Sequence, residues 1–116
     1  MTPVRTAEPV MPLRGDVWDA RFPEPVGDHP VVVLTSNALV PRLGAITVAV
    51  ITGTQGPRTT HVPVDADAGV TKYPVSWVNA ADIQTLPRSR LRRFRGRLSP
   101  AELRTLEGCL RAVLVR

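Results

Sequence analysis

The chain has 116 residues, is 43% hydrophobic and 22% charged, and carries a formal net charge of +5 at pH 7. These values indicate one globular domain with a core of modest size, and they exclude a disordered or multidomain chain. Fourteen of its 15 basic residues are arginine, which favours an anionic, phosphate-bearing partner. The single Cys109 excludes an internal disulfide and a cysteine zinc site. No signal peptide or membrane span is recognised, so we expect a cytoplasmic protein without a membrane partner.

Residues 1–13 contain three prolines and little hydrophobic patterning, which predicts a flexible N-terminal tail before a single domain over 14–116. From residue 14 the run RGDVWDARF alternates, with Trp18, Ala20 and Phe22 sharing one face of an extended chain. We expect a first strand that is buried on this face alone.

The aliphatic run Val31–Leu34 predicts a strand buried on both faces. Asp28 and His29 stand immediately before it, followed by Pro30, which cannot donate to a ladder. Because imidazole titrates near neutral pH, His29 is a candidate for proton transfer, which Asp28 would assist by orienting the ring. The alternative is a solvated loop histidine.

Three further extended segments follow. The β-branched run 45–52 predicts a strand that ends at Thr52, and 59–64 and 75–78 predict two shorter strands separated by a polar loop over 65–74. Between residues 79 and 98, arginines alternate with apolar residues. In an extended chain, Arg93, Arg95 and Arg97 would share one face as a basic stripe, which is either solvated or in contact with nucleic acid.

The end of the chain predicts an amphipathic helix. Ser99, Pro100 and Glu102 form a capping box with proline at the first helical position, and leucines then recur at helical spacing. Cys109 lies beside this apolar stripe, as expected of a small core residue. Short strands with Gly and Pro turns, covered by one helix, predict a mainly β (α+β) fold, a compact and partly open β-barrel.

Several short segments occur in a characteristic order along the chain. They are Arg14-Gly15-Asp16-Val17-Trp18, His29 to Leu34, Ala49 to Thr52, Ser76-Trp77-Val78, Ile83 to Leu86 and Arg97-Leu98-Ser99 with the terminal helix. In this order they resemble the MazF/PemK family of type II toxin–antitoxin toxins, within the Kid/CcdB-like superfamily. The resemblance covers about residues 14 to 115 and rests on the ordered set rather than on any one motif.

The resemblance implies an SH3-like, partly open barrel of five to seven strands that forms a homodimer. It also implies a sequence-selective endoribonuclease that uses no metal ion or other cofactor. Such an enzyme cleaves single-stranded RNA to 2′,3′-cyclic phosphate and 5′-hydroxyl ends, which inhibits translation and growth. A cognate antitoxin with an acidic C-terminal segment would occupy the RNA groove.

The family's motifs are matched only in part. Thr52 matches a threonine at the end of the third strand, and Ser76 matches a serine that contacts RNA in some relatives. The chain has His29 where the family has a catalytic arginine, and Ala81-Asp82 where it has an acidic residue followed by Gln. We therefore expect His29 as acid or base and Thr52 as a donor to the phosphate.

The expected substrate-binding residues are Ser76, Asp82, Thr54 and Arg58. Arg58, in the loop after Thr52, would replace the missing positive charge. Loss of the family arginine also leaves open a non-catalytic relative that binds protein, either a gyrase poison like CcdB or an antitoxin-binding decoy. His61 is expected to be a surface strand residue, and Trp77 either a core residue or a stacking face for a base.

Overall fold

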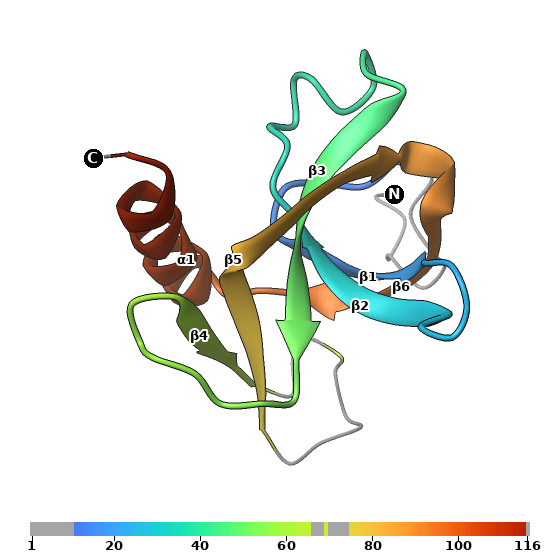
Figure 1. Ribbon diagram of the computed structural model, residues 1–116. Coiled ribbons are helices and arrows are strands. Elements are labelled where there is room, and N and C mark those ends of the chain that lie inside the picture. The colour runs from blue at the N-terminus through green and yellow to red at the C-terminus, as the bar shows by residue number, and fades with distance from the viewer. Residues whose placement is uncertain (1–10, 66–68, 70–74, 116) are drawn as a thin grey trace, which may run out of the picture.

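The computed structural model describes residues 11–65, 69 and 75–115. Its described strands form one antiparallel sheet in the order β4-β5-β3-β2-β1-β6, and a helix lies against it (Figure 1). The fold prediction of a partly open β-barrel with a C-terminal helix is confirmed. The elements are β1 (Asp16–Arg21), β2 (Asp28–Val33), β3 (Ala45–Thr52), β4 (His61–Val64), β5 (Ser76–Pro87), a 3₁₀ turn (Arg88–Arg90), β6 (Leu91–Arg97) and α1 (Pro100–Leu114).

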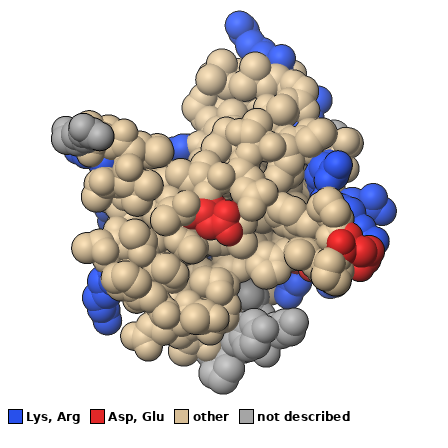
Figure 2. All heavy atoms as spheres, in the orientation of Figure 1, with Lys and Arg blue, Asp and Glu red and all other residues tan. Residues whose placement is uncertain are grey.

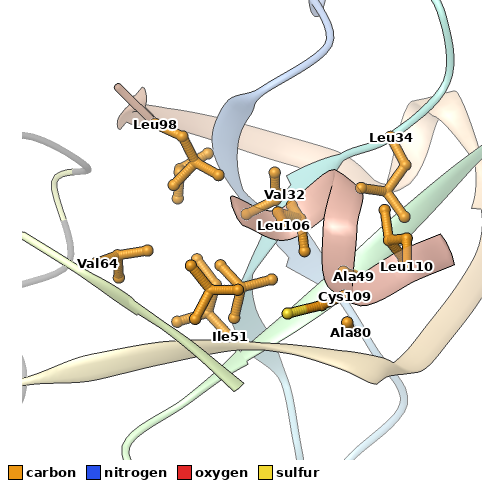
Figure 3. Close-up of a cluster of buried hydrophobic side chains, with 13 residues drawn as sticks. Val32, Leu34, Ala49, Ile51, Val64, Ala80, Leu98, Leu106, Cys109 and Leu110 are labelled. Carbon is orange, nitrogen blue, oxygen red and sulfur yellow. The ribbon is translucent and has the colours of Figure 1, made fainter. Parts of the chain in front are cut away.

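Successive side chains of each strand point to opposite sides of the sheet, and each side carries a buried cluster. One face packs under α1, where Leu106, Cys109 and Leu110 of the helix point toward Val32 and Ala49 (Figure 3). The curled sheet encloses a second cluster on its other face, which consists of Trp18, Ala20, Val31, Val33, Val40, Ile46, Val48 and Leu86.

The first strand is therefore buried on both faces near its start, and the expectation of one buried face is wrong. Val17 is fully buried in the cluster under α1, while its neighbour Trp18 lies in the other cluster. The reason is that the helix, which is remote in sequence, covers the face that alternation left to solvent.

The helix begins with the predicted capping box. The Ser99 side chain accepts from the Glu102 backbone N–H, and the Glu102 carboxylate accepts from the Ser99 N–H. Cys109 is buried and its thiol donates to the Arg58 carbonyl at 3.6 Å, so the expectation of a small core residue is confirmed.

Asp16 joins the start of β1 to the end of β6. Its fully buried carboxylate accepts from the Leu13 N–H, the Trp18 indole N–H and the Arg97 guanidinium. Met11 is half-buried against the second core cluster, so the described part of the predicted tail is packed. Residues 1–10 of that tail lie outside the described residues, as do 66–68 and 70–74 of the predicted polar loop.

β5 is much longer than the predicted strand over 75–78. It runs for 12 residues. Its pairing with β3 is interrupted by a bulge, because Asn79 lies opposite Val50 whereas Ile83 lies opposite the next residue of β3, Ala49. This bulge interrupts the alternation of side chains, which is why the sequence pattern ends near residue 78 although the strand continues.

Candidate active site

A cavity of about 330 Å³ opens where β2 begins, β3 ends and β5 begins. The end of β3 and the start of β5 lie together at the bottom of Figure 1. β1 and β6 supply the remaining side of the cavity. Its lining is Asp19, Asp28, His29, Pro30, Ile51, Thr52, Gly53, Thr54, Ser76 and Arg95. Four of the six predicted site residues are thus brought together here, namely His29, Thr52, Thr54 and Ser76.

His29 is held by the edge of β3. Its Nε2 lies 2.6 Å from the carbonyl oxygen of Ile51. The paired part of β2 and β3 ends at Val31 opposite Val50. Pro30 is the next residue of β2, and it has no N–H to offer the Ile51 carbonyl. Because a carbonyl can only accept, Nε2 carries the proton, and the lone pair of a neutral His29 is on Nδ1.

Asp28 does not orient this ring. Its carboxylate accepts from Arg21 at 3.4 Å on the exposed side of the β1–β2 turn. The ring of Phe22 contacts His29 edge-on instead, with 6.3 Å between the ring centroids. The His29 ring is therefore positioned by a backbone carbonyl and an aromatic neighbour.

Thr52 and Thr54 form a tight turn at the end of β3. The Thr52 hydroxyl oxygen accepts from the Thr54 backbone N–H at 3.1 Å. Since this bond uses an oxygen lone pair, the hydroxyl proton of Thr52 can still be donated to a ligand in the cavity.

Ser76 also lines this cavity, and its hydroxyl is buried. The residue is 2% exposed, and its Oγ has no hydrogen-bond partner among the residues that the structure describes. Buried polar side chains nearly always have a partner, because an unsatisfied hydroxyl costs about 1–3 kcal/mol. A ligand in the cavity that Ser76 lines could supply the partner that this hydroxyl lacks among the described residues.

Arg95 and Asp19 also line the cavity. Neither was predicted as a catalytic or substrate-binding residue, although Arg95 belonged to the basic stripe that was expected to be either solvated or in contact with nucleic acid. Arg95 Nη1 lies 3.1 Å from both carboxylate oxygens of Asp19, and its Nη2 donates to the Gly69 carbonyl at 2.7 Å. The only sequence signal for this pair was an acidic residue in the first strand and an arginine-rich last strand.

A bulge in β6 explains why alternation missed this pair. Phe94 lies opposite Trp18 and Gly96 opposite Val17, which leaves Arg95 as the extra residue. The prediction that Arg93, Arg95 and Arg97 share one face is wrong, because Arg95 reaches Asp19 whereas Arg97 reaches Asp16. Asp16 and Asp19 are three residues apart in β1 and so point to opposite faces.

Asp82 and Arg58 do not line the cavity. Asp82 lies in the bulged part of β5 and accepts from the Gln84 amide at 3.1 Å. Arg58 is exposed in the loop before β4. His61 is half-buried, and its ring is hydrogen-bonded to the Thr60 hydroxyl at 2.7 Å. Trp77 is half-buried and lies opposite Thr52 in the sheet. Neither residue lines the cavity.

The positive charge is unevenly distributed. In the face shown in Figure 2, Lys and Arg lie at the margins, while the centre is largely uncharged around one acidic patch. Several arginines are also paired with acids, among them Arg14 with Glu107 and Arg21 with Glu24. An anionic partner would meet positive charge at the rim of this face rather than at its centre.

Comparison with known proteins defines the class to which this barrel and its cavity belong. The sequence profile described as PemK-like, MazF-like toxin of type II toxin–antitoxin system matches residues 13–114. The chain belongs to this family, and the resemblance seen in the sequence is confirmed.

Individual relatives sharpen the assignment. The chain is 39% identical over 100 residues to the probable endoribonuclease MazF2 of Mycobacterium tuberculosis, covering 85% of this chain and 94% of that protein. It is also similar to the solved Mycobacterium tuberculosis toxin MazF-mt6, with a TM-score of 0.74, 30% identity and coverage of 84% and 94%. A mycobacterial endoribonuclease in complex with its cognate antitoxin matches with a TM-score of 0.78, 25% identity and coverage of 89% and 94%.

These matches make the chain a MazF-type toxin and a homologue of endoribonucleases. Among the described residues, no helix has the length and apolar character needed to cross a membrane. Within the same residues, His, Cys, Asp and Glu side chains form no group of three suited to a metal ion.

Proposed function

We propose that this protein is a sequence-selective endoribonuclease that cleaves single-stranded RNA without a metal ion. In the proposed reaction, a ribose 2′-hydroxyl attacks the adjacent phosphorus and the bond to the 5′-oxygen of the next nucleotide breaks. The products are a 2′,3′-cyclic phosphate and a 5′-hydroxyl. The observation that carries this proposal is the cavity lined by His29, Thr52 and Ser76, where the Ser76 hydroxyl has no partner among the described residues.

The reaction needs one proton removed from the 2′-hydroxyl and one delivered to the leaving 5′-oxygen. His29 takes the first proton at Nδ1, since Nε2 is committed to the Ile51 carbonyl. Water delivers the second. A positioned acid or base of this kind contributes about 10²–10⁴-fold to the rate.

The remaining groups bind the substrate. Thr52 donates its hydroxyl proton to a nonbridging phosphate oxygen, where negative charge grows in the transition state. Ser76 donates to the substrate from the cavity wall, and Thr54 flanks Thr52 at the rim. We keep Asp82 and Arg58 as contacts to RNA outside the cavity, where they would affect which sequences bind.

We further propose a cognate antitoxin with an acidic C-terminal segment, a homodimer, and action in the cytoplasm, where the RNA substrate is found. A mycobacterial relative was solved in complex with its cognate antitoxin, and a Deinococcus radiodurans relative as a MazE–MazF complex. The net charge of +5 suits both an acidic segment and RNA as partners. By occupying the cavity, the antitoxin would prevent translation from being inhibited.

The experiment that tests the activity incubates antitoxin-free protein with long single-stranded RNA in EDTA and maps both new ends by sequencing. His29→Ala is compared with His61→Ala. His61 is the other histidine of the chain and does not line the cavity. We expect discrete cuts with 5′-hydroxyl ends in the wild type and in His61→Ala, and their loss in His29→Ala.

A folded wild-type protein that leaves several RNA classes uncut would refute the proposed activity. The observation that favours a second function is His29 itself, because the family has arginine at this position. In that outcome the protein would act by binding a protein target, as a gyrase poison or as a decoy for antitoxin.

A further inference from the structure

We propose that Arg95 binds the substrate phosphate in this cavity and that Asp19 holds its guanidinium in place. The inference rests on the proposed function, and it concerns the positive charge that His29 cannot supply as a neutral base. Arg95 is the one arginine among the described residues that line the cavity. The sequence suggested Arg58 for this role, but Arg58 is exposed in a loop and does not line the cavity.

The backbone directs Arg95 toward the site. As the extra residue of the β6 bulge, it lies over β1 rather than following the regular alternation of the strand. Asp19 lies opposite Pro30 in the β1–β2 register, and the adjacent pair is Ala20 with His29. Asp19, Arg95 and His29 all line the cavity, so the guanidinium and the proposed base belong to one site.

The guanidinium is ordered before any ligand binds. Asp19 accepts from Nη1 with both oxygens and Gly69 accepts from Nη2, so two groups on different segments fix its plane. The Arg95 side chain is 24% exposed and the Asp19 side chain 14%. A partly desolvated, preoriented charge stabilises a developing negative charge more strongly than a mobile surface arginine does.

The contacts leave donors for a phosphate. A guanidinium has five N–H groups, and the bonds to Asp19 and Gly69 use at most three of them. The Nε–H and one N–H of Nη2 are not used by these contacts. Arg95 can hold Asp19 on one edge while it donates to a phosphate oxygen from the others.

Gly69 supports this arrangement at short range. Its φ is +77°, and a Cβ at this position would lie 1.9 Å from the Arg95 carbonyl oxygen. Only a residue without a side chain can approach β6 so closely and place its carbonyl on the guanidinium. The positioning of Arg95 thus depends on residues 69 and 19, which are far apart in the chain.

The test compares Arg95→Gln and Arg95→Lys with Arg93→Gln, which removes an exposed arginine of the same strand outside the cavity. Cleavage is measured as kcat and KM on a single-stranded RNA. Binding is measured by fluorescence anisotropy on a DNA strand of the same sequence, which has no 2′-hydroxyl and is not cleaved. Thermal unfolding confirms that each variant is folded.

We expect Arg95→Gln to lower kcat about 10²–10³-fold, as loss of one preorganised donor does. Arg95→Lys should retain more activity than Arg95→Gln, because the charge remains while the paired contacts are lost. Asp19→Asn should lower kcat by less than Arg95→Gln. Arg93→Gln should leave kcat unchanged.

Two results would overturn the inference. The first is a folded Arg95→Gln variant with wild-type kcat, which would make the Asp19 pair structural. The second is equal DNA binding by Arg95→Gln and Arg93→Gln in the anisotropy measurement, which decides the matter if the wild type cleaves no RNA and the proposed function fails. If Arg95→Gln instead weakens DNA binding more than Arg93→Gln does, the inference stands without the proposed activity.

Discussion

Replacing Ser76 by alanine should make the protein more stable and less active. Ser76 is 2% exposed and its hydroxyl has no hydrogen-bond partner among the described residues, so the folded state bears the cost of desolvating that hydroxyl. That cost is about 1–3 kcal/mol. Removing one oxygen atom forfeits several contacts of about 0.1–0.2 kcal/mol each. The free energy of unfolding should therefore rise by about 1 kcal/mol, which raises Tm by about 4 °C in a domain of this size.

The same substitution should weaken the proposed substrate contact. A hydrogen bond to a charged phosphate contributes about 1.5–3 kcal/mol, so we expect cleavage of RNA to fall at least about 10-fold in kcat/KM. Tm and kcat/KM are measured at one protein concentration, because any association of subunits also affects Tm. Ser89→Ala, an exposed serine in the 3₁₀ turn, is the control and should change neither value.

Two outcomes would refute this reasoning. A Ser76→Ala variant with a Tm several degrees lower would mean that the hydroxyl has a partner in the free protein. A more stable variant that cleaves RNA as fast as the wild type would mean that the hydroxyl is unsatisfied but does not touch the substrate.

Other expected effects test the base and the framework around it. His29→Arg should recover part of the cleavage lost in His29→Ala and flatten the pH–rate profile near neutrality, because a guanidinium stays protonated there; equal activity of both variants would remove His29 from the mechanism. Asp16→Ala should lower the free energy of unfolding in urea by about 3 kcal/mol, since buried donors including the Trp18 indole lose their acceptor; a loss below about 1 kcal/mol would contradict this. Gly15→Ala should lower the free energy of unfolding in urea by about 1–2 kcal/mol, because φ at this residue is +88° and the new Cβ would lie 3.3 Å from Leu103. An unchanged urea midpoint would show that alanine is not strained at this position.

The elements that were predicted correctly depend on local chemistry. The capping box and the leucine spacing specify the helix, and the β-branched run 45–52 specifies β3 with the predicted bounds. His29 and Thr52 were singled out by their places beside buried strands and by resemblance to the family. The structure places both at one cavity although 23 positions separate them in the sequence.

Two of the predictions that failed concern strands with bulges. A bulge in β5 hid most of a 12-residue strand, and a bulge in β6 turned Arg95 toward Asp19 while alternation assigned it to a surface stripe. A bulge adds a residue to one strand without a partner in the other, so its position depends on how two strands pair, and no single segment encodes it.

The amino-acid sequence by itself determined the class of fold, the toxin family, the terminal helix and the candidacy of His29, Thr52 and Ser76, because these follow from short-range patterns and ordered motifs. Tertiary structure alone decided which ring nitrogen of His29 contacts the Ile51 carbonyl, that the Ser76 hydroxyl has no partner among the described residues, and that Arg95 lines the cavity. Each of these depends on a backbone group or strand register contributed by a distant segment. Hydrogen-bond partners and burial arise only when such segments pack together.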